Sequence, residues 1–155
     1  MIPKSEVRGI SMKTDEIHTA HGLVEVTFNS DLDAVYLRWI SEYDEGTRVR
    51  DAVRAALDYV RANDVKHWVV DVSMSSHALS NEDYEWVSSE DFRASIRNSP
   101  LQKFVLLPPL PDSGQDDRWV KDWEQNTLAN FGDRVKAKVC DGLKDARTFL
   151  LQEKE

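Results

Sequence analysis

The 155-residue sequence predicts a single α/β domain, in which one mixed sheet of about five strands is flanked by about four helices. Short apolar runs at residues 67–72 and 104–107 are bounded by polar residues or proline, which is typical of strands buried on both faces. Residues 46–63 instead carry apolar side chains at every third or fourth position, as amphipathic helices do. A strand, a helix and a strand at this spacing favour a right-handed parallel crossover.

The start of the chain is polar and aperiodic. We therefore predict a flexible N-terminal arm over residues 1–20, with an added edge strand as the alternative, and a domain over residues 21–155. His18 and His21 would lie together on a helix and offer two metal ligands. Structural zinc needs four ligands, so we interpret both histidines as solvated and expect no metal site.

The next segments predict a hairpin and a helix. Residues 23–28 and 34–40 alternate in the manner of paired strands around a turn signal at residues 29–31. The helix that follows ends at Asn63, which fits as a left-handed stop. Its polar face mixes acids with three arginines, which we interpret as a solvated face rather than an anion site: Arg50, Arg54 and Arg61.

The stretch around which the chain is organised runs strand, loop, helix over residues 65–87. Asp71 lies at the carboxyl end of the strand, the edge at which open α/β sheets usually meet ligands and partners. Ser80 is placed to cap the helix, and the side chain of Asp83, three residues later, is placed to bond back to the backbone of Ser80 as in a capping box. A candidate interaction or regulatory region therefore comprises Asp71, Ser76, His77 and Ser80.

The second half continues the alternation of helices and strands. The helix from Ser80 is expected to break at Ser88 and Ser89, where a second helix starts. Trp119 and Trp123, spaced i, i+4 on a later helix that ends at Gly132, are further candidates for a partner anchor, although we favour a place in the core. Residues 135–140 alternate with lysines as an edge strand does, and Asp141 is expected to cap the last helix.

Composition narrows the function classes. The net charge of −8 disfavours broad binding to nucleic acids or anionic membranes, because phosphate contacts need a basic face. No apolar run approaches the roughly 20 residues of a membrane span, and residues 1–17 lack the hydrophobic core of a signal peptide. Cys140 is the single cysteine and allows no internal disulfide. We expect a soluble cytoplasmic protein.

No catalytic motif stands out. The sequence has no G-x-S-x-G elbow, Gly-rich phosphate loop or H-E-x-x-H motif, and no histidine lies near Cys140 in the chain. His77 and Asp71 form the only His–acid pair at a strand end, but no nucleophile is placed beside them by sequence. We therefore expect a protein that is not an enzyme and holds no cofactor.

The order and spacing of the elements resemble the SpoIIAA-like family, which is related to STAS domains. The resemblance covers residues 22–151 and is carried by four segments: AVYLRW at 34–39, VKHWVVD at 65–71, LSNEDYEWV at 79–87, and DGLKDA at 141–146 with Phe149 and Leu150. It implies a bacterial, cytoplasmic interaction module, and a neighbouring group with Sec14-type architecture binds lipids. Where STAS antagonists carry a phosphorylated serine in an Asp-Ser-Ser-Gly-type stretch, this chain has Ala78-Leu79-Ser80-Asn81, so we interpret Ser80 as a helix cap.

From residues and resemblance together we expect a non-enzymatic regulatory or protein-interaction module whose protein partner is unknown. The alternative is a binder of a small apolar ligand or lipid. The five tryptophans could enclose a pocket or fill a solid core equally well, and we predict a filled core. We also expect a homodimer, because the loop at residues 108–117, with Leu110 and the helix of Trp119 and Trp123 behind it, is the best candidate for exposed apolar surface.

Overall fold

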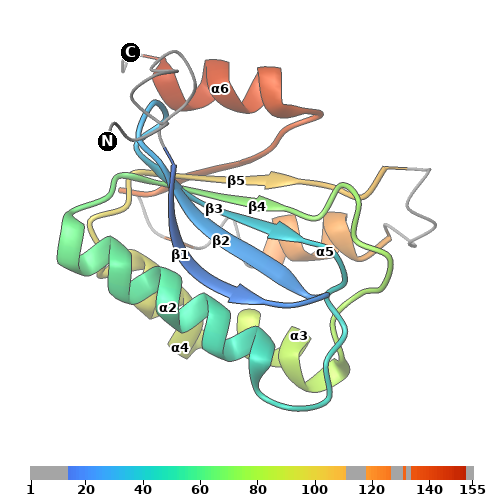
Figure 1. The fold of residues 1–155 in the computed structure, drawn as a ribbon. Coiled ribbons are helices and arrows are strands. Elements are labelled where there is room, and N and C mark those ends of the chain that lie inside the picture. Colours follow the sequence, from blue (N-terminus) through green and yellow to red (C-terminus); the bar gives the residue numbers. More distant parts are fainter. Residues whose placement is uncertain (1–13, 111–117, 127–130, 132–133, 153–155) are drawn as a thin grey trace.

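The computed structural model describes residues 14–110, 118–126, 131 and 134–152, and in them one mixed sheet packs against helices on both faces (Figure 1). The sheet has six strands in the order β1-β2-β3-β4-β5-β6, and five helices are described. The α/β prediction with a single mixed sheet is confirmed, with one more strand and one more helix than expected. The strands are β1 Thr14–Ala20, β2 Val24–Asn29, β3 Ala34–Trp39, β4 His67–Asp71, β5 Lys103–Leu107 and β6 Lys136–Val139; the helices are α2 Arg48–Asn63, α3 Asn81–Val87, α4 Glu90–Arg97, α5 Arg118–Asn126 and α6 Leu143–Leu151.

The additional strand is β1, which corrects the prediction of a flexible arm for residues 14–20. β1 pairs antiparallel with β2 and forms the edge of the sheet, with an irregularity in register between Glu16 and His18. Ile17 and Ala20 pack on the core, while the remaining side chains supply little apolar pattern. The strand forms because the backbone N–H and C=O groups on the side of β2 away from β3 need hydrogen-bond partners, a requirement that the local sequence of residues 14–20 does not reveal. The rest of the expected arm, residues 1–13, lies outside the described residues.

The expected hairpin is confirmed and leads into a parallel half-sheet. β2 pairs antiparallel with β3, whereas β3, β4, β5 and β6 pair in parallel. Arg38 is in register with Asp71, and Asp71 with Leu107. The carboxyl ends of β3, β4 and β5 therefore lie at one edge, as the general rule for such sheets requires.

The two faces of the sheet are covered unequally. Figure 1 shows α2, α3 and α4 on one side of the sheet and α6 on the other. The first face carries the larger apolar cluster, which includes Trp68, Phe104 and Trp123. The second face carries a smaller apolar cluster around Val105, against which α6 packs. Lys103 holds the carboxyl end of α6, because the Lys103 ammonium donates to the carbonyls of Phe149 at 2.6 Å and Gln152 at 3.0 Å. Cations at a helix carboxyl end stabilise its unpaired carbonyls.

Most helix ends follow local sequence, with two corrections. The break between α3 and α4 is confirmed, and Ser89 caps α4 by accepting from the Phe92 N–H at 3.2 Å. The left-handed stop of α2 is Asp64, with φ of 55°, rather than Asn63. The N-cap of α6 is Gly142 with no side-chain bond, so Asp141 does not cap it. Both deviations are shifts of one residue, within the usual uncertainty of helix ends.

The helices of the described ranges include none that is both long enough and apolar enough to cross a bilayer.

Candidate functional site

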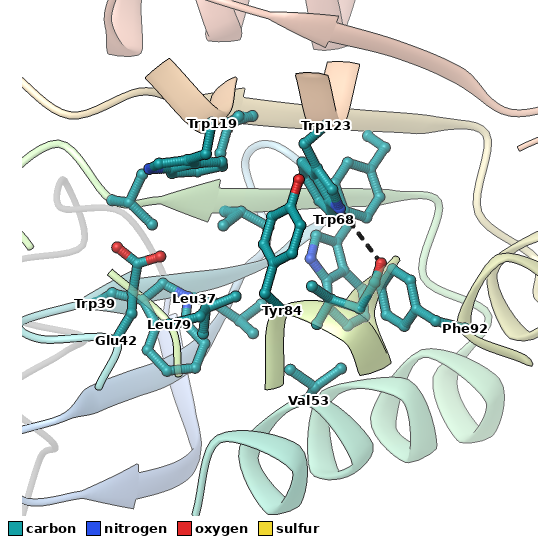
Figure 2. Close-up of a pocket in the computed structure, with 15 residues that line it drawn as sticks. Leu37, Trp39, Glu42, Val53, Trp68, Leu79, Tyr84, Phe92, Trp119 and Trp123 are labelled. Atoms are coloured by element: carbon teal, nitrogen blue, oxygen red, sulfur yellow. Dashed lines mark hydrogen bonds between the residues drawn. The ribbon is translucent and has the colours of Figure 1, made fainter. Parts of the chain in front are cut away.

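An apolar pocket opens between α3, α5 and one face of strands β3, β4 and β5 (Figure 2). It consists of an inner hollow of about 50 Å³ and an adjoining outer hollow of about 240 Å³. Four residues line both hollows, which makes them one continuous site: Glu42, Leu79, Tyr84 and Trp119. The expectation of a filled core is not met at this edge, where α3 and α5 of the described residues leave space over the strand ends.

The inner end of the pocket is a set of packed aromatic rings. Trp68 stacks on Phe104 with ring centroids 5.8 Å apart, and Trp123 meets the same Phe104 edge-on at 6.2 Å. The Trp123 indole also donates to the Val87 carbonyl at 3.3 Å, which fixes α5 against α3. Such rings lose little conformational freedom on ligand binding because packing already holds them.

The outer hollow has a more polar rim. Ala78, Leu79 and Asn81 lie on the loop and helix start after β4 and line it together with Tyr84 and Trp119. The Tyr84 hydroxyl donates to Asp122 of α5 at 2.9 Å. Burial and this carboxylate raise the pKa of Tyr84 to about 12, so the phenol stays neutral at physiological pH.

Glu42 is the acidic group of the pocket, and only 3% of its surface is exposed. It follows β3, and backbone bonds hold its segment against the loop after β4: the Glu42 N–H donates to the His77 carbonyl at 2.9 Å and the Ser76 N–H to the Ile40 carbonyl at 3.1 Å. Figure 2 shows its carboxylate on the side of the pocket where Trp39 and Trp119 lie. The backbone therefore fixes an acid inside a mostly apolar site.

The predicted site residues divide into two groups. Trp119 and Trp123 are confirmed as core-facing, and both line the pocket, Trp123 buried and Trp119 half-buried. The expected end of their helix at Gly132 lies outside the described residues. Asp71, in contrast, is occupied elsewhere: it accepts from the Tyr36 hydroxyl at 2.6 Å and from the Ser73 N–H at 3.0 Å.

The suggested pairing of Asp71 with His77 is not made. His77 is exposed, and its Nδ1 lies 2.9 Å from the Ser76 hydroxyl instead. Asp71 bonds to Tyr36 because β3 and β4 place the two side chains on the same face of the sheet, two residues apart in register. A phenol and a half-buried carboxylate make a strong hydrogen bond there.

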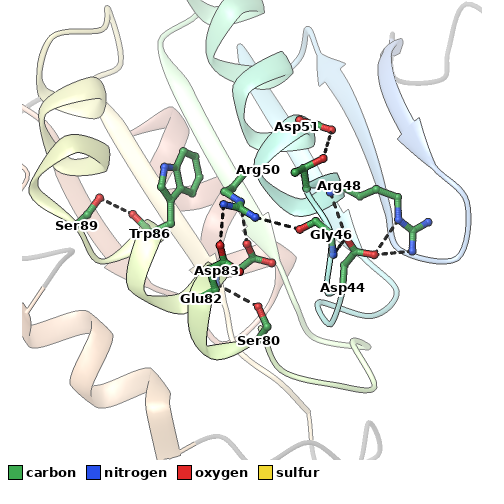
Figure 3. A network of polar contacts seen from close by, with 11 residues as sticks. Asp44, Gly46, Arg48, Arg50, Asp51, Ser80, Glu82, Asp83, Trp86 and Ser89 are labelled. Carbon is green, nitrogen blue, oxygen red and sulfur yellow. Dashed lines mark hydrogen bonds and ion pairs between the residues drawn. The ribbon is translucent and has the colours of Figure 1, made fainter.

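Ser80 caps α3 as predicted, since its hydroxyl accepts from the Asp83 N–H at 3.2 Å. The predicted contact from the Asp83 side chain back to the start of α3 is wrong. The Asp83 carboxylate instead forms an ion pair with Arg50 of α2, whose Nε lies 3.1 Å away (Figure 3). Asp83 is 1% exposed, and burial raises its pKa although the charge of Arg50 opposes this. We call these two residues the Arg50–Asp83 pair.

The same contact corrects the view of the α2 arginines as wholly solvated. Arg50 is 18% exposed and also reaches Glu82 at 3.4 Å and the Gly46 carbonyl at 3.1 Å. The Arg54 guanidinium lies 5.2 Å from the centre of the Trp86 ring. These arginines join α2 to α3 rather than forming an anion site.

Sequence reasoning missed Glu42 and Tyr84 as pocket residues. Glu42 lies in an irregular segment after β3, and no periodic pattern marks it as buried. Tyr84 was visible only as an apolar position of α3. Among the described residues, no group of three or more His, Cys, Asp and Glu side chains is placed to hold a metal ion.

Comparison with known proteins gave no match to any family model, curated protein or solved structure. The geometry of the pocket is therefore the basis for assigning a function.

Proposed function

We propose that this protein is a binding module whose pocket takes a small, largely apolar molecule. The observation that carries the proposal is the pair of adjoining hollows, lined by packed tryptophans and open at the carboxyl edge of the sheet. Ligand sites are typically apolar clefts at this place in α/β folds.

The size of the pocket favours a small ligand over a long-chain lipid. The outer hollow of about 240 Å³ lies slightly below the roughly 300–1,000 Å³ of typical ligand sites. The inner hollow adds about 50 Å³ and ends against Trp68 and Phe104. The site therefore suits a compact body of two or three rings or a short branched chain.

The first prediction is that the neutral fluorescent probe N-phenyl-1-naphthylamine binds in this pocket. Ala78 lines the outer hollow, so Ala78→Trp should fill it and weaken probe binding at least about tenfold, which is 1.4 kcal/mol. Fluorescence titration at pH 7 measures the affinity.

Met74→Trp is the matched control, because Met74 lies on the same loop, is exposed and does not line the pocket. It should bind the probe as the parent chain does. Equal binding by both variants, or no saturable binding by the parent chain, contradicts the proposed function.

A second candidate function is the protein-interaction role of SpoIIAA-like type, with a second copy of the chain as partner. Three large apolar side chains are exposed on the loops after β3, β4 and β5: Ile40 at 37%, Met74 at 56% and Leu110 at 41%. The Leu110 N–H donates to the Ser73 carbonyl at 3.0 Å, which joins two of these loops. Residues 111–117, the rest of the loop expected to mediate dimerisation, lie outside the described residues.

The second prediction is that the parent chain sediments as a dimer at micromolar concentration, because a two-fold contact would cover these side chains. Met74→Asp combined with Leu110→Asp should shift it to the monomer. Leu143→Asp, at an equally exposed leucine of α6, should leave the dimer intact. A parent chain that sediments as a monomer removes this candidate and leaves the pocket proposal untouched.

A further inference from the structure

We propose that the ligand of this pocket is an organic cation, a small aromatic or branched aliphatic body that carries an ammonium group next to Glu42. This inference rests on the proposed function, since it names the chemical class of ligand for the same site.

The first support is the charge of the site. Glu42 and Tyr84 are the only ionisable side chains among the lining residues that the structure describes, and no lysine or arginine is among those. A carboxylate can accept about four hydrogen bonds, so a ligand cation can join the interactions that Glu42 already makes. A buried carboxylate gains more from such a charge than an exposed one, because solvent screens it less.

The second support is the aromatic lining around the acid. Trp39, Tyr84 and Trp119 line the pocket together with Glu42, and Figure 2 draws Trp39 and Trp119 on the acid's side. Aromatic ring faces attract ammonium groups within about 6 Å, and aromatic cages for quaternary ammonium ions use this attraction. An apolar body can then fill the space towards Trp68 and Phe104.

Two arginines of α2 are engaged in ion pairs with residues that do not line the pocket. Arg50 belongs to the Arg50–Asp83 pair, and Arg48 forms an ion pair with Asp44 at 2.9 Å. An anionic ligand would meet the Glu42 carboxylate, and the described lining residues offer it no lysine or arginine. The net charge of −8 also attracts cations to the protein as a whole.

Competition against bound N-phenyl-1-naphthylamine tests the inference with three probes of similar shape. Benzyltrimethylammonium is the cation, neopentylbenzene its neutral isostere and phenylmethanesulfonate the anion. At pH 7 and low salt, the cation should displace the probe at a concentration at least about tenfold lower than the neutral isostere, and the anion least well.

Glu42→Gln should reduce the affinity for benzyltrimethylammonium about tenfold and leave that for neopentylbenzene unchanged, which also shows that the variant is folded. Trp119→Leu should weaken binding of benzyltrimethylammonium more than binding of neopentylbenzene. Glu85→Gln removes the same charge from an exposed position of α3 and should change neither the affinity for benzyltrimethylammonium nor that for neopentylbenzene.

The outcomes separate the two proposals. If the fluorescent probe binds in the pocket but the cation displaces it no better than the neutral isostere, the cation inference is overturned while the binding function stands. The cation inference is likewise overturned if Glu42→Gln lowers both affinities equally. If the fluorescent probe does not bind in the pocket at all, the proposed function itself is overturned.

Discussion

Arg50→Met should lower the free energy of unfolding by about 3 kcal/mol at pH 7, because it leaves the Asp83 carboxylate buried without its cation. Asp83 is 1% exposed, and neither of its carboxylate oxygens has a hydrogen-bond partner among the described residues. The contact to Arg50 therefore supplies most of its compensation. Urea unfolding followed by far-UV circular dichroism measures the loss.

The pH dependence of this variant follows from the raised pKa of Asp83. Burial raises the pKa in the folded protein above the ordinary value of 3.8, so between the two values the folded state binds more protons than the unfolded state. The contribution of Asp83 to stability therefore falls as pH rises through this window. Loss of Arg50 raises the pKa further, so Arg50→Met should recover part of its lost stability, relative to the parent chain, on acidification from pH 7 towards this window.

Two further variants make the test specific. Arg61→Met, at an exposed position of the same helix, should change the unfolding free energy by less than about 0.5 kcal/mol. Arg50→Met combined with Asp83→Leu should regain most of the stability, since an apolar pair can replace a buried ion pair. If the double variant is less stable than Arg50→Met alone, the buried charge is not the cause of the loss.

Phe104→Ala should lower the free energy of unfolding by about 4 kcal/mol, because it empties the centre of the larger apolar cluster. Phe104 is fully buried on β5 and contacts three rings, those of Trp68, Trp123 and Phe131. Its removal leaves a cavity that the rigid strand cannot close. The measurement is again urea unfolding, with tryptophan fluorescence as a second probe because two neighbours are tryptophans.

Phe104→Leu is the matched control, since it keeps most of the volume and should cost roughly 1.5 kcal/mol or less. Tyr43→Ala removes an aromatic ring from an exposed site and should cost less than about 0.5 kcal/mol. A loss for Phe104→Ala no larger than that for Phe104→Leu would show that the cluster collapses around the missing ring, and that β5 does not hold α5 in place.

The pocket and the stability of the domain depend on the same rings. Phe104 and Trp123 line the inner hollow and also join α5 to the sheet. Glu42 and Trp119 line both hollows without belonging to the buried residues of the larger apolar cluster. The Ala78, Glu42 and Trp119 variants therefore report on binding, whereas the Phe104 variant reports on folding.

The sequence by itself determined the features that local chemistry controls. The hairpin of β2 and β3, helix α2 and strands β4, β5 and β6 follow from alternation and helical spacing. Ser80 and Ser89 cap their helices because a serine hydroxyl accepts from a backbone N–H three residues away, wherever the helix packs. These contacts span a few residues, so a few residues specify them.

Only the tertiary structure decided the features that join distant segments. β1 forms because β2 needs a partner, and Asp83 turns from its own helix to Arg50 because α2 packs beside α3. Within the described residues, the pocket exists because α5 and α3 leave space over the strand ends, with Glu42 held inside by a backbone bond to the distant loop at His77. Each depends on how elements far apart in the chain come together, and the order of residues within any one element does not record it.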